Sequence, residues 1–106
     1  MADIKYTERV VYSTLKSRPQ IEEQLYYSSN MDALDVLMDM DNLIKQAKLT
    51  PYQSVIFDLY FRQGYQMHEI AQMVGVKHHT NISMAIKNAK KKIKKILVKW
   101  GEVDGE

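Results

Sequence analysis

Apolar residues recur along most of the chain at intervals of three and four, the spacing of one face of an α-helix. This pattern predicts helices over residues 6–16, 20–27, 31–47, 51–63, 67–74 and 80–100. The chain has 106 residues and 45% hydrophobic content, enough for one small domain or for one compact unit with an extra helical arm. We therefore expect an all-α fold.

The first three predicted helices form an N-terminal arm, residues 1–48, which serves packing, dimerisation or partner binding. Val10, Val11 and Leu15 mark the inner face of the first helix. Pro19 should end that helix, because proline disfavours helical backbone at the preceding residue, Arg18. Polar residues 28–30 should then separate the second helix from the third and cap the third.

The third predicted helix has aspartates in its early turns and lysines in its last turn, which matches the helix dipole at both ends. We interpret its acidic side as a solvated face, and a docking surface for a partner is the alternative. The expected inner face comprises Leu34, Leu37, Met38, Ile44 and Ala47, widened by Met40 and Leu43.

Strong local signals mark the fourth predicted helix, residues 51–63. Thr50 is the expected N-cap, Pro51 suits the first helical position, and Gln53 completes a capping box. Gly64 should end the helix in a left-handed conformation. The expected buried residues of this helix are Val55, Ile56, Leu59 and Tyr60.

The last two predicted helices are joined by a glycine turn. Gly75 follows the helix over residues 67–74, and Val76 can fill the turn behind it. Ala71 is small enough for two helices to cross closely. This arrangement predicts a helix-turn-helix unit that binds DNA. The inner stripe of the final helix comprises Ile82, Ala85, Ile86, Ala89, Ile93, Ile96, Leu97 and Trp100.

The outward face of the final helix carries side chains that can read DNA. At 100° per residue, polar and lysine residues lie opposite the inner stripe. Asparagine and serine can bond to base edges, methionine can touch a thymine methyl group, and lysine suits phosphate or guanine. The turn lysine and histidines can approach phosphate. The predicted DNA-binding residues are Lys77, His78, His79, Thr80, Asn81, Ser83, Met84, Lys87, Asn88, Lys91 and Lys94.

The charge is distributed unevenly along the chain. Residues 1–50 hold six Lys/Arg against eight Asp/Glu, a net −2, whereas residues 51–106 hold nine against five, a net +4. Most of the basic charge lies on the final helix, where it favours a polyanionic partner such as double-stranded DNA. A membrane-surface helix is the alternative, but the apolar stripe is already needed for packing.

Other classes of function find little support in the residues. There is no cysteine, no glycine-rich phosphate loop, and no HExxH spacing around His68. No apolar run approaches the roughly 18 residues of a membrane span. We expect no enzyme, no metal, no cofactor and no membrane partner, and a cytoplasmic protein. The polar residues 101–106 should fray.

Several segments together resemble region four of bacterial sigma factors: Leu49-Thr50-Pro51, Leu59-Tyr60-Phe61, Gly64, Glu69-Ile70-Ala71, Val74-Gly75-Val76 and Ala89-Lys90-Lys91-Lys92-Ile93. The resemblance covers close to half the chain and implies a helix-turn-helix domain over residues 49–100. It also implies promoter reading by the last helix and contact with RNA polymerase. The family's DNA-reading positions match Thr80, Asn81, Ser83, Met84 and Lys87.

The chain departs from the family in three respects. Ile82 lies seven residues after Gly75, where the family usually has six, and Lys77, His78 and His79 replace an arginine-rich helix start. The large region that precedes this domain in a complete sigma factor is also missing. We therefore expect a small sigma-like transcription regulator, of the kind found in phages and prophages.

Two other functions stay open on the sequence. One is a protein-interaction module that binds RNA polymerase or a sigma factor without reading DNA. The other is a phage DNA-packaging recognition subunit. A regulator that binds DNA without polymerase should be a homodimer, because one helix-turn-helix makes few specific contacts. Its expected dimer surface is the stripe over residues 34–44 or the end of the final helix, residues 96–100.

Overall fold

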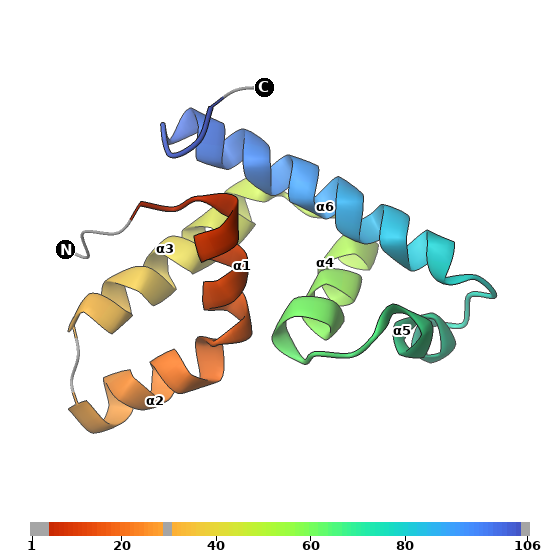
Figure 1. The fold of residues 1–106 in the computed structure, drawn as a ribbon, viewed down its shortest axis with the longest axis horizontal. Coiled ribbons are helices and arrows are strands. Elements are labelled where there is room, and N and C mark those ends of the chain that lie inside the picture. The colour runs from red at the N-terminus through yellow and green to blue at the C-terminus, as the bar shows by residue number, and fades with distance from the viewer. Residues whose placement is uncertain (1–4, 29–30, 105–106) are drawn as a thin grey trace.

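The computed structural model describes residues 5–28 and 31–104. Within these ranges the regular structure is entirely helical, which confirms the predicted all-α fold. Helix α6 lies along one edge of the molecule, and α3, α4 and α5 lie on one side of it (Figure 1). In chain order the elements are α1 (Glu8–Lys16), α2 (Arg18–Ser28), α3 (Met31–Ala47), α4 (Pro51–Phe57), the π-helical turn η1 (Asp58–Arg62), α5 (Met67–Val74) and α6 (His79–Lys99).

Two helix starts are fixed by reciprocal capping boxes. The Thr50 hydroxyl accepts from Gln53 N–H, and Gln53 Oε1 accepts from Thr50 N–H, which confirms the predicted start of α4 at Pro51. A second box joins Gln66 and Glu69 at the start of α5. Each box satisfies backbone donors that the first helical turn leaves without partners.

The predicted fourth helix has the expected extent but two backbone geometries. Helix α4 passes into η1, where Gln63 N–H donates to Asp58 O, five residues earlier. Its buried side is Ile56, Phe57 and Phe61. The prediction that Val55 is buried was wrong, because the helix turns the Ile56 side toward α6 and leaves Val55 52% exposed.

Helix α3 has the predicted bounds but a rotated inner face. Met40 and Leu43, expected at the margin, are the most buried residues of this helix. Met38 was expected inside and is 56% exposed. The rotation follows from packing, because α2 and α6 both contact α3 and together select which side is covered.

The boundary between α1 and α2 is tighter than predicted. Ser17 alone separates them, and Arg18 is helical although Pro19 follows it. Proline is tolerated there because it lies in the first turn of α2, where its missing N–H needs no partner. Ser28, expected in a polar break, belongs to α2, and Ser29 and Asn30 lie outside the described residues.

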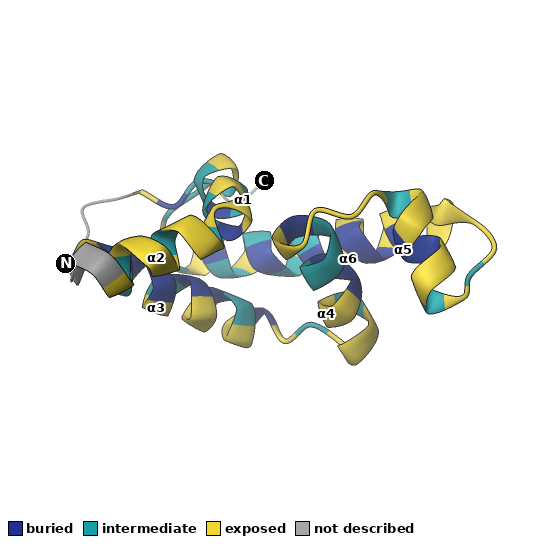
Figure 2. Cartoon of the chain, turned by 90° about the horizontal axis from the view of Figure 1, so that it is seen from below, coloured by how far each residue is buried: buried dark blue, intermediate teal, exposed yellow. Residues whose placement is uncertain are grey.

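The predicted arm and the predicted helix-turn-helix share one hydrophobic core. Val11 and Met40 from residues 1–48 belong to the same buried cluster as Ile56, Ile93 and Leu97. The buried positions lie on the sides of the helices that face one another (Figure 2). The two segments therefore stabilise each other.

Tyr6 joins the two ends of the described chain. Its N–H donates to Glu102 Oε2 at 3.1 Å, and its hydroxyl donates to Asp39 Oδ2 at 2.6 Å. Val103 packs against the core. Residues 101–103, which we expected to fray, therefore contact both the N-terminal segment and the core, whereas residues 105 and 106 lie outside the described ranges.

An aromatic cluster joins α1 to the helix formed by α4 and η1. The Tyr12 ring stacks on Phe61 with centroids 4.9 Å apart, and Phe57 lies 4.6 Å from Phe61. The Tyr12 hydroxyl is buried without a hydrogen-bond partner among the described residues. Its ring therefore stabilises the core while its oxygen does not.

Tyr6 and Tyr12 should respond oppositely to removal of the hydroxyl group. Tyr6→Phe loses a hydrogen bond to a carboxylate, so we expect the free energy of unfolding to fall by about 1–2 kcal/mol. Tyr12→Phe removes an unpartnered polar atom, so we expect no change or a gain of up to about 1 kcal/mol. Urea unfolding of both variants measures this difference. Equal losses would contradict the assigned roles.

Alkaline pH should destabilise the protein through ionisation of Tyr12. Burial raises the pKa of the Tyr12 hydroxyl above its ordinary value of about 10. The folded state therefore retains this proton to higher pH than the unfolded chain does. The resulting stabilisation is fully present below about pH 10 and is lost as the pH rises further. Unfolding measured from pH 9 to 11 should show a shallower loss for Tyr12→Phe than for the wild type.

Candidate nucleic-acid interface

The turn between α5 and α6 has the predicted left-handed glycine. Gly75 has φ 82° and ψ 26°, and the N–H groups of Gly75 and Val76 both donate to Ala71 O at 3.0 Å. Val76 is half-buried and packs against the core, as the sequence predicted. His78 is extended and precedes the first residue of α6. This geometry fixes the direction in which α6 leaves the turn.

Helix α6 buries one face and exposes the other. Ile82, Ala89, Ile93 and Leu97 are fully buried, and α3, α4 and α5 pack against this side. The residues predicted for the opposite face are all exposed, and the structure bears out their orientation. They are Thr80, Asn81, Ser83, Met84, Lys87, Asn88 and Lys91.

The turn residues Lys77, His78 and His79 are also exposed, directly before and at the start of α6. His78 makes no side-chain cap to the helix. All three residues therefore lie exposed at the end of α6 that is joined to α5 (Figure 1).

The lysines of α6 divide into two groups. Lys90 Nζ lies 5.2 Å from the centroid of the Tyr12 ring and 5.4 Å from that of Phe61, and Lys92 Nζ donates to Gln53 Oε1 at 2.7 Å. These half-buried lysines fasten α6 to α1, η1 and α4. The exposed lysines of this helix are Lys87, Lys91, Lys95 and Lys99.

Lys94 and Lys95 differ from the predicted assignment. Lys94, predicted to contact phosphate, is half-buried, whereas Lys95 is exposed and was not predicted. Lys95 follows Lys91 by four residues and so continues the same outward row. The helical rotation of 100° per residue was therefore enough to place Lys95 on the outward face from the sequence.

The segment that contains α6 is basic over a long stretch. Between Glu69 and Glu102 the chain has eight lysines and no acidic residue. The outward side chains therefore present hydrogen-bonding groups near the start of α6 and positive charge farther along it. This combination suits a nucleic acid, whose bases carry donors and acceptors and whose backbone carries phosphate.

Comparison with models of known families, with curated proteins and with solved structures gives no match. In the described ranges, no three histidine, aspartate or glutamate side chains gather as potential metal ligands. None of the helices described combines the length and the apolar character needed to cross a bilayer.

Replacing Gly75 should weaken the turn through backbone strain alone. No atom lies within 4 Å of the position that an added Cβ would occupy, so Gly75→Ala meets no clash. Its φ of 82° is nevertheless unfavourable for alanine, and we expect a loss of about 1 kcal/mol in unfolding free energy. Gly75→Asn is the matched control and should lose less, because asparagine tolerates this conformation. Urea unfolding of Gly75→Ala at wild-type stability would contradict this account.

Proposed function

We propose that this chain is a sequence-specific DNA-binding transcription regulator with a helix-turn-helix similar to sigma region four. The observation that carries the proposal is the outward face of α6, which is exposed, rich in lysine and free of acidic residues. The glycine turn before α6 and the resemblance of residues 49–100 support the same function.

In this proposal the first half of α6 enters the major groove. Asn81, Ser83 and Asn88 offer donors and acceptors to base edges, and Met84, which is 50% exposed, offers an apolar contact to a thymine methyl group. Residues 80–91 span roughly 16 Å along the helix axis. The exposed Lys95 and Lys99 lie beyond this span, so positive charge continues past the residues that read bases.

The basic half of α6 binds the DNA backbone. Lys87, Lys91 and Lys95 are exposed at intervals of four and neutralise phosphates beside the groove. Lys90 and Lys92 contribute mainly to folding, because their ammonium groups already contact Tyr12, Phe61 and Gln53. Substitution of Lys87, Lys91 or Lys95 should therefore change DNA affinity, whereas substitution of Lys90 or Lys92 should mainly change stability.

We also propose that the regulator acts with a partner, since one helix-turn-helix supplies few specific contacts. RNA polymerase is the partner that the family resemblance implies. Each of the two dimer surfaces expected from the sequence is already partly used within the chain, although Met38 on the first is 56% exposed. Leu37, Met40 and Leu43 are buried within the chain, and the half-buried Trp100 donates to Gln46 Oε1 at 3.2 Å.

Alanine variants should separate the two kinds of DNA contact. Lys91→Ala and Lys95→Ala should weaken binding to all sequences and lower the slope of log K against log salt by about one per lost phosphate contact. Asn81→Ala should instead reduce the preference for the selected sequence by roughly 5- to 100-fold. Lys5→Ala removes an exposed lysine from the other end of the chain and serves as the control.

The measurement is fluorescence anisotropy with a random-sequence DNA pool at two salt concentrations, followed by recovery and sequencing of bound DNA. We expect salt-dependent binding and an enriched motif. Absence of binding near 0.1 M salt, at concentrations well above the roughly 10⁻⁴ to 10⁻⁶ M of nonspecific binders, would instead indicate a module that binds RNA polymerase or a sigma factor. Binding by a large ring oligomer would indicate a DNA-packaging recognition subunit.

A further inference from the structure

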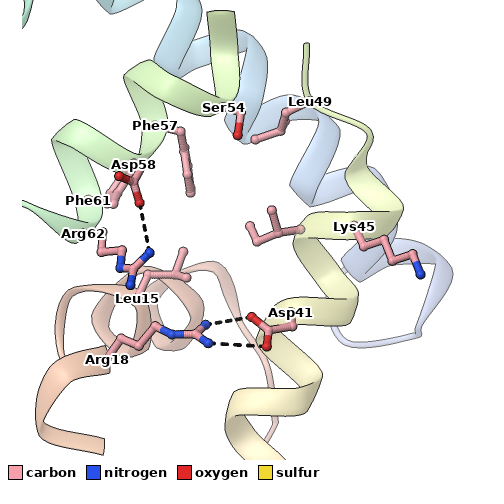
Figure 3. Close-up of a pocket in the computed structure, with 11 residues that line it drawn as sticks. Leu15, Arg18, Asp41, Lys45, Leu49, Ser54, Phe57, Asp58, Phe61 and Arg62 are labelled. Atoms are coloured by element: carbon pink, nitrogen blue, oxygen red, sulfur yellow. Dashed lines mark hydrogen bonds and ion pairs between the residues drawn. The ribbon is translucent and has the colours of Figure 1, made fainter. Parts of the chain in front are cut away.

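A pocket of about 370 Å³ lies between the first three helices and the helix formed by α4 and η1 (Figure 3). Leu15, Phe57 and Phe61 are buried and Ile44 and Leu49 half-buried among its lining residues, so its floor is apolar. The volume falls in the range of roughly 300–1,000 Å³ that is typical of small-molecule sites. No residue of α6 lines the pocket, so it is separate from the proposed DNA interface.

Charged groups surround this apolar floor. Arg18 binds Asp41 through two hydrogen bonds of 2.8 and 3.3 Å, which join α2 to α3 beside the pocket (Figure 3). Asp58 Oδ2 accepts from Gln63 Nε2 at 2.9 Å, and Asp58 Oδ1 lies 3.6 Å from Arg62 Nη1. Both carboxylates of the lining are therefore already engaged with donors of the chain.

The rim retains donors that the protein does not use. The ammonium group of Lys45 and the hydroxyl of Ser54 have no hydrogen-bond partner within the described residues, and Arg62 is 59% exposed. Of the three cations in the lining, Arg18 is bonded to Asp41 and to Glu22, and Arg62 lies against Asp58, whereas no described carboxylate pairs with Lys45. An anionic group at this rim can accept from Arg62, which keeps donors beyond its one contact to Asp58, and from the ammonium group of Lys45.

The wall contributed by η1 has an unusual backbone. Asp58, Phe61 and Arg62 lie on the π-helical turn, which has one residue more per hydrogen-bonded ring than an α-helix. Such turns are rare and are found frequently at functional sites. This turn supplies an aromatic ring for the floor and both charges of one rim segment.

We propose that this pocket binds a small apolar carboxylic acid. The apolar body of the ligand packs against Leu15, Phe57 and Phe61, and its carboxylate lies at the cationic rim. An inorganic anion would leave the apolar floor in contact with water, and an uncharged hydrocarbon would leave the rim donors without an acceptor. The inference does not depend on DNA binding.

The test uses two probes of nearly equal size, 4-phenylbutyrate and its uncharged counterpart 4-phenyl-1-butanol. Each is titrated into the ¹⁵N-labelled full-length chain, without DNA, and amide shifts are followed by NMR. We expect saturable shifts centred on Leu49, Ser54 and Phe57. For a ligand of about 12 heavy atoms the expected Kd is in the millimolar range, on the order of 1–10 mM. The acid should bind at least about threefold more tightly than the alcohol.

Three variants locate the two parts of the site. Lys45→Gln/Arg62→Gln should reduce the preference for the acid to about onefold, whereas Lys48→Gln removes an exposed cation outside the pocket and should keep it. Ser54→Trp enlarges an exposed residue of the lining and should abolish binding of both probes. Circular dichroism of each variant verifies that the helices are retained.

The outcomes are distinct. Equal affinity for acid and alcohol would overturn the anionic selectivity, and shifts centred on the lysines of α6 would show that the carboxylate binds elsewhere. Absence of saturable shifts up to about 20 mM would overturn the site, because that concentration exceeds the expected Kd. The proposed site would be established by three results together. The preference for the acid disappears in Lys45→Gln/Arg62→Gln, both probes fail to bind Ser54→Trp, and Lys48→Gln keeps the preference.

Discussion

The apolar stripe of α6 is the feature on which the rest of the structure depends. Three other helices, α3, α4 and α5, pack against it, and Ile82, Ile93 and Leu97 are fully buried in the core that these helices share. Because packing covers this face, the polar residues and most lysines must lie on the opposite side. The helix that organises the fold is thus also the helix proposed to read DNA.

The aromatic cluster around Phe61 connects the N-terminal segment to this central helix. Tyr12 brings α1 against η1, and Lys90 extends from α6 over both rings. A lysine in this position contributes attraction to the ring faces while its aliphatic stem covers apolar surface. Residues 1–48 therefore support the position of α6 without lying on its outward face. The pocket proposed to bind a carboxylic acid occupies part of the same junction, on the core side of the molecule.

Local signals in the sequence determined most of the helix boundaries. Three such signals are the capping box of Thr50 and Gln53, Pro51 inside that box, and the left-handed Gly75. Each acts within a few residues, so its effect can be predicted without knowledge of the fold. The outward row of α6 was equally predictable, because a long helix with a continuous apolar stripe has only one exposed side.

The tertiary structure decided which of several apolar faces is covered. Val55 and Met38 are as hydrophobic as their buried neighbours, and only the positions of α2 and α6 leave them exposed. The π-helical turn, the half-buried setting of Lys94 and the ends joined through Tyr6 likewise depend on residues distant in the chain. The sequence by itself therefore determined most helix boundaries and which side of α6 is polar. Long-range packing determined the rotation of each helix, because burial depends on neighbours that periodicity does not specify.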